Sequence, residues 1–385
     1  MRSLFPGLGA VLALTAMISA AWSCPFCTMQ GQTLTKEVRD ADLVILGTST
    51  NARPSPDGLD GTCDFVIEDV IKAHPVIKDQ KKITLPRYIP ESKVKYLLFC
   101  TVFKDRPDPF RGIPLKDTEM VGYLKGALAL DEKNIPKRLE YFFPYLESSE
   151  IEISTDAYKE FAAADDKDVV AMIEKTDKAK MRAKLMEWLR SPETASYRYG
   201  LYGYLLGRCG KPEDAEVLVD LLNDPKRGLV SGIDGVLAGY VTLRPKEGWD
   251  YLIALLSDAK SDFTRRYAGL RTLRFFWDYH QEVIGPKELV RAMTILLDQP
   301  DIADLAIEDL RKWRQWDQLD RILALATRPS HDIPIVQRAI LRFALSCPSS
   351  KAAAFVEEQR KRNPERVKDV EELLRLDMPP AKTGG

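Results

Sequence analysis

Cys24-Pro25-Phe26-Cys27 stands directly behind a hydrophobic leader and heads the rest of a 385-residue chain. Arg2 and the 14-residue apolar run Leu8–Ala21 are typical of a secretory signal peptide, because such a run is too short to anchor stably in a bilayer. Small residues three positions and one position before Cys24 fit cleavage at that point. We therefore expect residues 1–23 to be removed and the protein to be exported to the periplasm, the cell surface or the medium.

The position of Cys24 leaves a lipid anchor on this residue as an alternative, although Trp22 is bulky where a lipoprotein signal usually has a small residue. No later segment is long and apolar enough to span a membrane, so we expect no transmembrane span in the mature chain. Hydrophobic residues make up 45% of the chain and charged residues 29%, a globular composition. The net charge of −1 excludes the strongly basic composition typical of nucleic-acid binding.

The cysteines fall into a group of four near the mature N-terminus and a pair far downstream, namely Cys24, Cys27, Cys63 and Cys100, then Cys209 and Cys347. In an oxidising compartment, four clustered cysteines predict two disulfides. A bond between Cys24 and Cys27 would close a tight ring, so we expect each of them to pair with Cys63 or Cys100. The sequence leaves open which pairs with which. The downstream pair lies on apolar helix faces and is expected to be buried and unpaired.

Residues 24–150 predict a small disulfide-linked β-barrel of about five strands with a preceding helix. The helix is expected at 32–40, where Thr33 or Thr35 can cap it. Strands are expected at 43–47, 63–72 (with a bulge), 82–85 and 96–103, with a hairpin loop at 51–61. Pro107 and Pro109 are expected to end the last of these strands.

Residues 151–378 predict an α-helical repeat domain, because apolar residues now recur at helical spacing. A four-residue motif that mostly ends in Pro recurs at the predicted helix ends. Its copies start at Leu189, Leu222, Leu256, Leu297 and Ala326. The intervals of 33, 34, 41 and 29 residues each accommodate two helices and a turn. Single helices of this kind bury their apolar faces only by stacking. Residues 379–385 are expected to form a disordered tail.

Two family resemblances follow from these motifs. The near-terminal Cys-x-x-Cys, the short helix, Ala41–Gly47 and Tyr96–Phe99 resemble the netrin-like modules of tissue inhibitors of metalloproteinases, over roughly residues 24–130. The resemblance implies an OB-type barrel whose terminal cysteine is tied to a downstream strand, and a terminal amine on Cys24 that chelates a target's zinc. The chain departs from the inhibitors, which typically begin Cys-x-Cys and carry more disulfides.

The later repeats resemble HEAT-type α-solenoids over about residues 180–375. The segment Arg198–Gly210, with its Gly-Leu-Tyr-Gly and Leu-Leu-Gly-Arg-Cys-Gly phrases, is similar to uncharacterised secreted bacterial repeat proteins. The resemblance implies a long surface that binds other macromolecules.

Sequence motifs for catalysis, cofactors and metals are absent from the chain, which has no nucleophile elbow, Walker A loop or dinucleotide fingerprint. The only histidines, His74, His280 and His331, lack metal-ligand spacing and are expected on the surface. A redox role for Cys24 and Cys27 would need a helix N-terminus behind a strand, whereas here the signal peptide precedes them. We therefore expect no catalytic residue, no metal and no cofactor.

A basic and aromatic segment is the best candidate for a binding surface, since Arg and Trp are enriched at binding hot spots. The candidate residues are Arg271, Arg274, Arg311, Lys312, Trp313, Arg314 and Trp316. The alternative is that Trp313 and Trp316, three residues apart, pack against an adjacent repeat while the basic side chains are solvated.

The sequence thus predicts an exported, non-enzymatic scaffold that binds a protein or another envelope macromolecule through its α-solenoid. One alternative is an envelope thiol-disulfide protein that uses Cys24 and Cys27. Another is an inhibitor-like binder that uses the N-terminal barrel.

Overall fold

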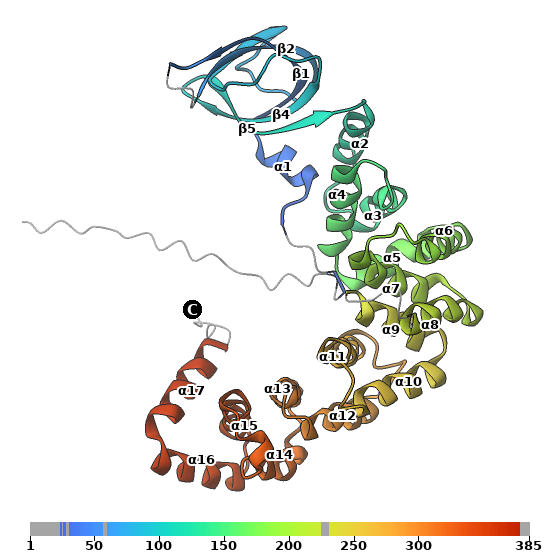
Figure 1. Cartoon of the computed structure of the whole chain (residues 1–385), viewed down its shortest axis with the longest axis vertical. Coiled ribbons are helices and arrows are strands. Elements are labelled where there is room, and N and C mark those ends of the chain that lie inside the picture. The colour runs from blue at the N-terminus through green and yellow to red at the C-terminus, as the bar shows by residue number, and fades with distance from the viewer. Residues whose placement is uncertain (1–23, 25, 28–30, 57–59, 225–230, 378–385) are drawn as a thin grey trace, which may run out of the picture.

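The computed structural model describes residues 24, 26, 27, 31–56, 60–224 and 231–377. The expected signal peptide 1–23 and tail 379–385 lie outside these residues. Figure 1 shows a small sheet at one end of the molecule and a curved succession of helices leading away from it. Within the described part, no helix is both long and apolar enough to cross a membrane.

Five strands in the described residues form one antiparallel sheet in the order β3-β2-β1-β4-β5. Their bounds are β1 Leu43–Pro54, β2 Gly61–Lys72, β3 Lys82–Leu85, β4 Lys95–Phe103 and β5 Arg106–Leu115. The four strands expected from the sequence are confirmed as β1 to β4, with a bulge between β1 and β2. The expected helix is α1, Leu34–Asp40, and the Thr33 side chain caps it by accepting from the Lys36 amide.

The sheet is buried on both faces at β1, which explains the uninterrupted apolar run Leu43–Leu46. Leu43 and Ile45 point into the small core inside the sheet. Val44 and Leu46 point to the opposite face and join the large core shared with the helices. Side chains alternate across a strand, so a strand covered on both faces reads as continuous hydrophobic sequence.

The expected closed barrel is not formed by the described residues. Strands β3 and β5 are the two edges of the sheet, and no ladder joins them. Pro107 and Pro109, expected to end the strand region, instead lie inside β5 opposite Val102 and Cys100. Proline lacks an N–H and is tolerated on an edge strand, where one side needs no partner. The same prolines hide the fifth strand from sequence inspection.

The helices that follow the sheet begin at Glu119, well before the expected change at residue 151. In the N-terminal half of the helical part they are α2 Glu119–Leu128, α3 Ile135–Phe142, α4 Ile151–Ala162, α5 Asp166–Lys175, α6 Lys178–Arg190, α7 Tyr199–Cys209, α8 Ala215–Asn223 and α9 Ile233–Leu243. The remainder are α10 Pro245–Ser257, α11 Phe263–Tyr279, α12 Pro286–Ile295, α13 Ala303–Lys312, α14 Leu319–Leu325, α15 Pro334–Ser346, α16 Ser350–Arg362 and α17 Pro364–Asp377.

The helices from α7 onward lie in two layers. Helix α9 contacts both α7 and α11, and α13 contacts α15. These odd-numbered helices lie on the inner side of the curve, and α8, α10, α12 and α14 lie on its outer side (Figure 1). We call the surface of α7, α9, α11, α13 and α15 on the inner side of the curve the inner face.

Helices α7 and α9 meet at their glycines, which lets the two backbones approach closely. A Cβ atom on Gly239 would stand 2.1 Å from the carbonyl oxygen of Gly203, and one on Gly203 would stand 2.7 Å from Cα of Val236. Both obstacles are backbone atoms, so neither can move aside as a side chain would. This contact gives the Gly-rich phrase in 198–210 a structural role.

We predict that Gly239→Ala lowers the free energy of unfolding by about 1–3 kcal/mol, because the added methyl group overpacks the α7–α9 contact. Gly122→Ala is the matched control, since Gly122 lies in α2 and a Cβ there meets nothing within 4 Å. It should raise stability by about 0.5–1 kcal/mol, because alanine restricts the unfolded chain. Urea denaturation measures the free energy of unfolding of both variants. A change of the same sign in the two variants would contradict the prediction.

Candidate functional site

Cys24 and Cys27 form a disulfide with each other, and Cys63 and Cys100 are free and buried. The expected pairing of Cys24 and Cys27 with the two sheet cysteines is therefore wrong. Cys63 lies on β2 and Cys100 on β4, with β1 between them. Cys100 lies opposite Leu43 of β1, whereas the neighbours of Cys63 lie opposite Thr50 and Arg53, so the two cysteines are set apart along β1 as well as across it. Burial also raises the pKa of the Cys100 thiol to about 12.

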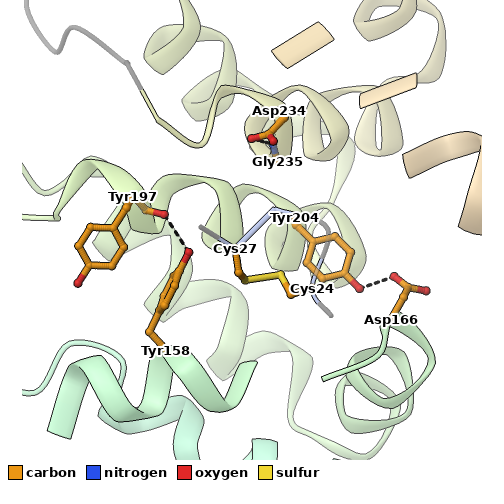
Figure 2. Close-up of a disulfide and its surroundings, with 8 residues drawn as sticks. All are labelled: Cys24, Cys27, Tyr158, Asp166, Tyr197, Tyr204, Asp234 and Gly235. Carbon is orange, nitrogen blue, oxygen red and sulfur yellow. Dashed lines mark hydrogen bonds between the residues drawn. A yellow bond between two sulfur atoms is a disulfide. The ribbon is translucent and has the colours of Figure 1, made fainter. Parts of the chain in front are cut away.

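The loop closed by this disulfide is attached to the helices and not to the sheet. The Cys24 amide donates to the carbonyl of Ala162, at the end of α4, over 3.0 Å. The Phe26 side chain is fully buried, with its ring 4.7 Å from that of Phe275 and 5.6 Å from that of Tyr204. Figure 2 shows the disulfide close to Tyr204, whose hydroxyl donates to Asp166. The expected role of Cys24 as the anchor of the barrel is thereby corrected.

The rest of the N-terminal segment binds along α4. The Leu34 amide donates to Asp156, the Thr35 hydroxyl donates to Glu160, and the Lys159 ammonium donates to the Gln32 carbonyl over 3.2 Å. Sequence inspection missed these residues, although acidic side chains on an apolar helix face are a usable signal of a buried polar contact.

Asp156 is the central group of this junction. It is buried and also accepts a 2.7 Å hydrogen bond from the Tyr123 hydroxyl. Burial, assisted by the neighbouring Glu160, raises the pKa of Asp156 to about 7. Glu160 is balanced by Arg138, whose guanidinium donates to it over 2.6 Å. The junction therefore holds one buried ion pair and one carboxyl group that titrates near neutrality.

A polar cluster adjoins Tyr204 and Phe275, the two rings that contact Phe26. His280, at the end of α11, is buried, with Nε2 3.4 Å from Asp166 Oδ1 and Nδ1 2.9 Å from Glu282 Oε1. Burial opposes ionisation of Asp166, but hydrogen bonds from His280 and Tyr204 outweigh it and lower the pKa of Asp166. Burial and the adjacent Asp166 raise the pKa of Tyr204.

The expectation of surface histidines is wrong for two of the three. His280 belongs to the cluster just described. His331 is also buried, with Nε2 2.8 Å from the Leu297 carbonyl oxygen. Both rings close hydrogen bonds at the ends of helices, a use of histidine that depends on packing and leaves no spacing in the sequence.

A pocket of about 320 Å³ opens beside the cluster and is lined by Asp165, Asp166, Lys167, Asp278 and Tyr279. Burial raises the pKa of Asp278, and Arg274 and Lys312 partly offset this. The lining offers carboxylates, an amine and a phenol, and contains no Ser or Cys. Among the described residues, no group of three or more His, Cys, Asp or Glu side chains is placed to hold a metal ion.

The basic binding candidates on α11 are in ion pairs with neighbouring helices. Arg271 Nε lies 2.9 Å from Asp234 Oδ2 of α9, and Arg274 Nε lies 2.8 Å from Asp309 Oδ2 of α13. Both carboxylates are buried, so these pairs are more than surface contacts. They connect successive helices of the inner layer.

The two tryptophans of the candidate segment pack against neighbouring helices. The ring of Trp313 stacks on Trp277 of α11 at 4.2 Å and 12°, and Trp316 meets Phe343 of α15 edge to face at 5.2 Å. Both contacts follow the packing alternative considered from the sequence.

The remaining three candidates divide by exposure. Arg311 is partly buried and pairs with Glu308 over 2.9 Å. Lys312 and Arg314 are exposed, and Arg314 has a φ of 56°, at the turn that ends α13. Lys312 is thus the exposed member of the candidate set that lies closest to the Arg274–Asp309 pair along the chain.

Cys209 and Cys347 are buried and free, as expected from their apolar helix faces. Burial raises the pKa of the Cys209 thiol to about 12. Zinc chelation by the Cys24 amine, which the inhibitor resemblance implies, would require release of its hydrogen bond to Ala162.

We predict that Phe26→Ala detaches the segment before α1, because it removes about 3–5 kcal/mol of aromatic packing. Hydrogen-exchange mass spectrometry should show faster exchange in the peptide that contains Cys24 and Cys27. Phe103→Ala is the control, because Phe103 is 65% exposed and its loss should change stability by no more than about 0.5 kcal/mol. Unchanged exchange in Phe26→Ala would show that the ring is not what holds the loop.

We predict a pH dependence of stability from Asp156. Its folded-state pKa is about 7 and its ordinary value is 3.8. Between these values the unfolded chain has lost the proton that the folded chain retains, so this group lowers stability as pH rises from about 4 to about 7. The asparagine in Asp156→Asn does not titrate. The free energy of unfolding of this variant should therefore fall by about 3–4 kcal/mol less than that of the wild-type protein across this range. The free energy of unfolding of both proteins is measured from pH 4 to 7. If it changes with pH equally in the wild-type protein and in Asp156→Asn, the assignment is wrong.

Comparison with known proteins found no matching family model, no similar curated protein and no similar solved structure.

Proposed function

We propose that this chain is an exported, non-enzymatic protein that binds a protein or another envelope macromolecule through the inner face of a HEAT-type α-solenoid. The observation that carries the proposal is the two-layer succession of helices, with the odd-numbered helices on the inner side of the curve (Figure 1). Stacked helix pairs present long concave surfaces, and binding macromolecules is their usual use.

Ion pairs between successive helices support this proposal by holding the inner face in one shape. The pairs are Asp234 with Arg271, Arg274 with Asp309, and Glu308 with Arg342. Each connects a helix to the next one of the inner layer. A surface that is already ordered loses less conformational entropy on binding, so more of the contact energy remains as affinity.

The exposed groups of the inner helices define the chemistry of the partner. Lys312 on α13 and Arg338 on α15 are exposed, and Ile335 on α15 is 57% exposed. The same helices carry the ion pairs named above, and the whole chain has a net charge of only −1. This mixture of an apolar side chain and interspersed charges suits a protein partner and not a uniformly charged polymer.

Export is part of the proposal, and the disulfide bears on the form of the mature N-terminus at Cys24. A thioether-linked lipid on Cys24 would use the same sulfur atom that forms the bond to Cys27. We therefore propose cleavage before Cys24 without lipidation. Unreduced intact mass spectrometry of the exported protein reports the cleavage site, the lipid and the disulfide together.

We predict that a photo-reactive amino acid at position 312 crosslinks a partner in cells of the host that exports the protein, and that one at position 287 does not. Lys287 on α12 is the matched control, since it is also an exposed lysine but lies on the outer layer. After mass spectrometry has identified the partner, its binding to purified protein should weaken about tenfold with Lys312→Glu plus Arg338→Glu.

The outer-layer variant Lys287→Glu should leave that affinity unchanged. Equal crosslinking at 287 and 312, or affinity that responds equally to both sets of charge reversals, would show that the inner face is not the binding surface. Circular dichroism of each variant verifies that the helices remain folded.

A further inference from the structure

We propose that the Cys24–Cys27 disulfide is a thiol-exchange site, and that Cys27 Sγ is the sulfur atom which an incoming thiolate attacks. This activity replaces the non-enzymatic part of the function proposed above, whereas the proposed binding through the inner face does not depend on it. It rests on three features of the loop: unequal access to its two sulfurs, attachment that does not depend on the disulfide, and the absence of a role for the bond in joining distant parts of the fold.

Access to the two cysteines is unequal. Cys24 is 5% exposed and belongs to the large hydrophobic core, whereas Cys27 is only partly buried. The rate of thiol–disulfide exchange depends on which sulfur can be reached by the incoming thiolate. Cys27 is therefore the point of attack, and Cys24 is the sulfur that leaves.

The loop is held in place by contacts other than the disulfide. Phe26 is fully buried against Phe275 and Tyr204, and the Cys24 amide is bonded to Ala162. The Cys27 amide also donates to the Cys24 carbonyl over 3.3 Å. Reduction removes none of these contacts, so the two thiols remain near each other and are able to re-form the bond.

The disulfide connects residues only three positions apart, so it does not staple distant elements. The chain-entropy stabilisation from a disulfide grows with the length of the loop that it closes, and this loop is very short. The other described cysteines are buried and free, which leaves the Cys24–Cys27 pair as the only disulfide among the described residues. A local disulfide at a partly exposed position suits exchange better than it suits cross-linking.

The reaction balances with a dithiol protein as the partner. A thiolate of the partner attacks Cys27 Sγ, the S–S bond breaks, and Cys24 leaves as a thiolate that takes a proton from water. The second thiol of the partner loses its proton to solvent and attacks the partner sulfur that is bonded to Cys27. This forms the partner's disulfide and releases Cys27 as a thiolate, which takes a proton from water. The partner is oxidised to a disulfide, and Cys24 and Cys27 are reduced to two thiols by two electrons.

The first test uses the wild-type mature protein with reduced glutathione as the probe. Brief reaction, acid quenching and peptide mass spectrometry should place the glutathione adduct on Cys27. Longer reaction should yield alkylatable thiols at Cys24 and Cys27 while Cys63 and Cys100 stay unmodified and the circular dichroism is unchanged. Reduction only after the protein unfolds, or an adduct mainly on Cys24, would overturn the proposal.

The second test compares Cys24→Ser with Cys27→Ser, each of which leaves one thiol of the pair. An aromatic disulfide reagent that releases a coloured thiolate should react about tenfold faster with Cys27 in the first variant than with Cys24 in the second. Equal rates, or the opposite order, would overturn the assignment of the attacked sulfur. The wild-type adduct mapping decides the question if either variant fails to fold.

Discussion

Helix α4 holds the described N-terminal residues from Cys24 to Thr35, and the start of α1 depends on this contact. Its residues Asp156, Lys159, Glu160 and Ala162 bind main-chain or hydroxyl groups between Cys24 and Thr35. Two of these are buried carboxylates, and a buried carboxylate is costly unless it is paired or hydrogen-bonded. The N-terminal segment supplies that partner for Asp156, and it shares Glu160 with Arg138.

Because of this contact, the sheet lies between two segments of the chain that are both attached to the helices. The described residues start on the helices with the disulfide loop, continue through α1 into the five strands, and return to the helices through α2 to α4. Arg111 on β5 reinforces the return, since its guanidinium binds Glu37 of α1 and, over 2.8 Å, Glu152 of α4. The sheet is thus connected to the helices both through α1, which precedes it, and through β5, its last strand. The disulfide loop lies beside α7 and α11.

The proposed exchange site and the proposed binding surface therefore share α11. Phe275 on this helix contacts Phe26, and Arg271 and Arg274 on the same helix pair with α9 and α13. The polar cluster of Asp166, Tyr204 and His280 is next to this contact, since the Tyr204 ring touches Phe26 and the His280 ring touches Phe275. A partner bound to the inner face would therefore contact a helix that also packs against the loop, although neither proposal requires the other.

The amino-acid sequence by itself determined most of the local structure. A continuous apolar run located β1, alternation located β2, and aromatic and β-favouring residues located β4, while Thr33 marked the start of α1. These signals depend on neighbouring residues alone. The sequence also indicated helices from residue 151 and the buried free state of Cys209 and Cys347. Only the tertiary structure decided the Cys24–Cys27 pairing, the edge strand that contains Pro107 and Pro109, and the burial of His280 and His331. Each depends on groups that are distant in sequence or on which strand lies beside which. Phe26 shows the difference most clearly, since its ring is enclosed by residues that lie about 180 and 250 positions further along the chain, and no local pattern records such a contact.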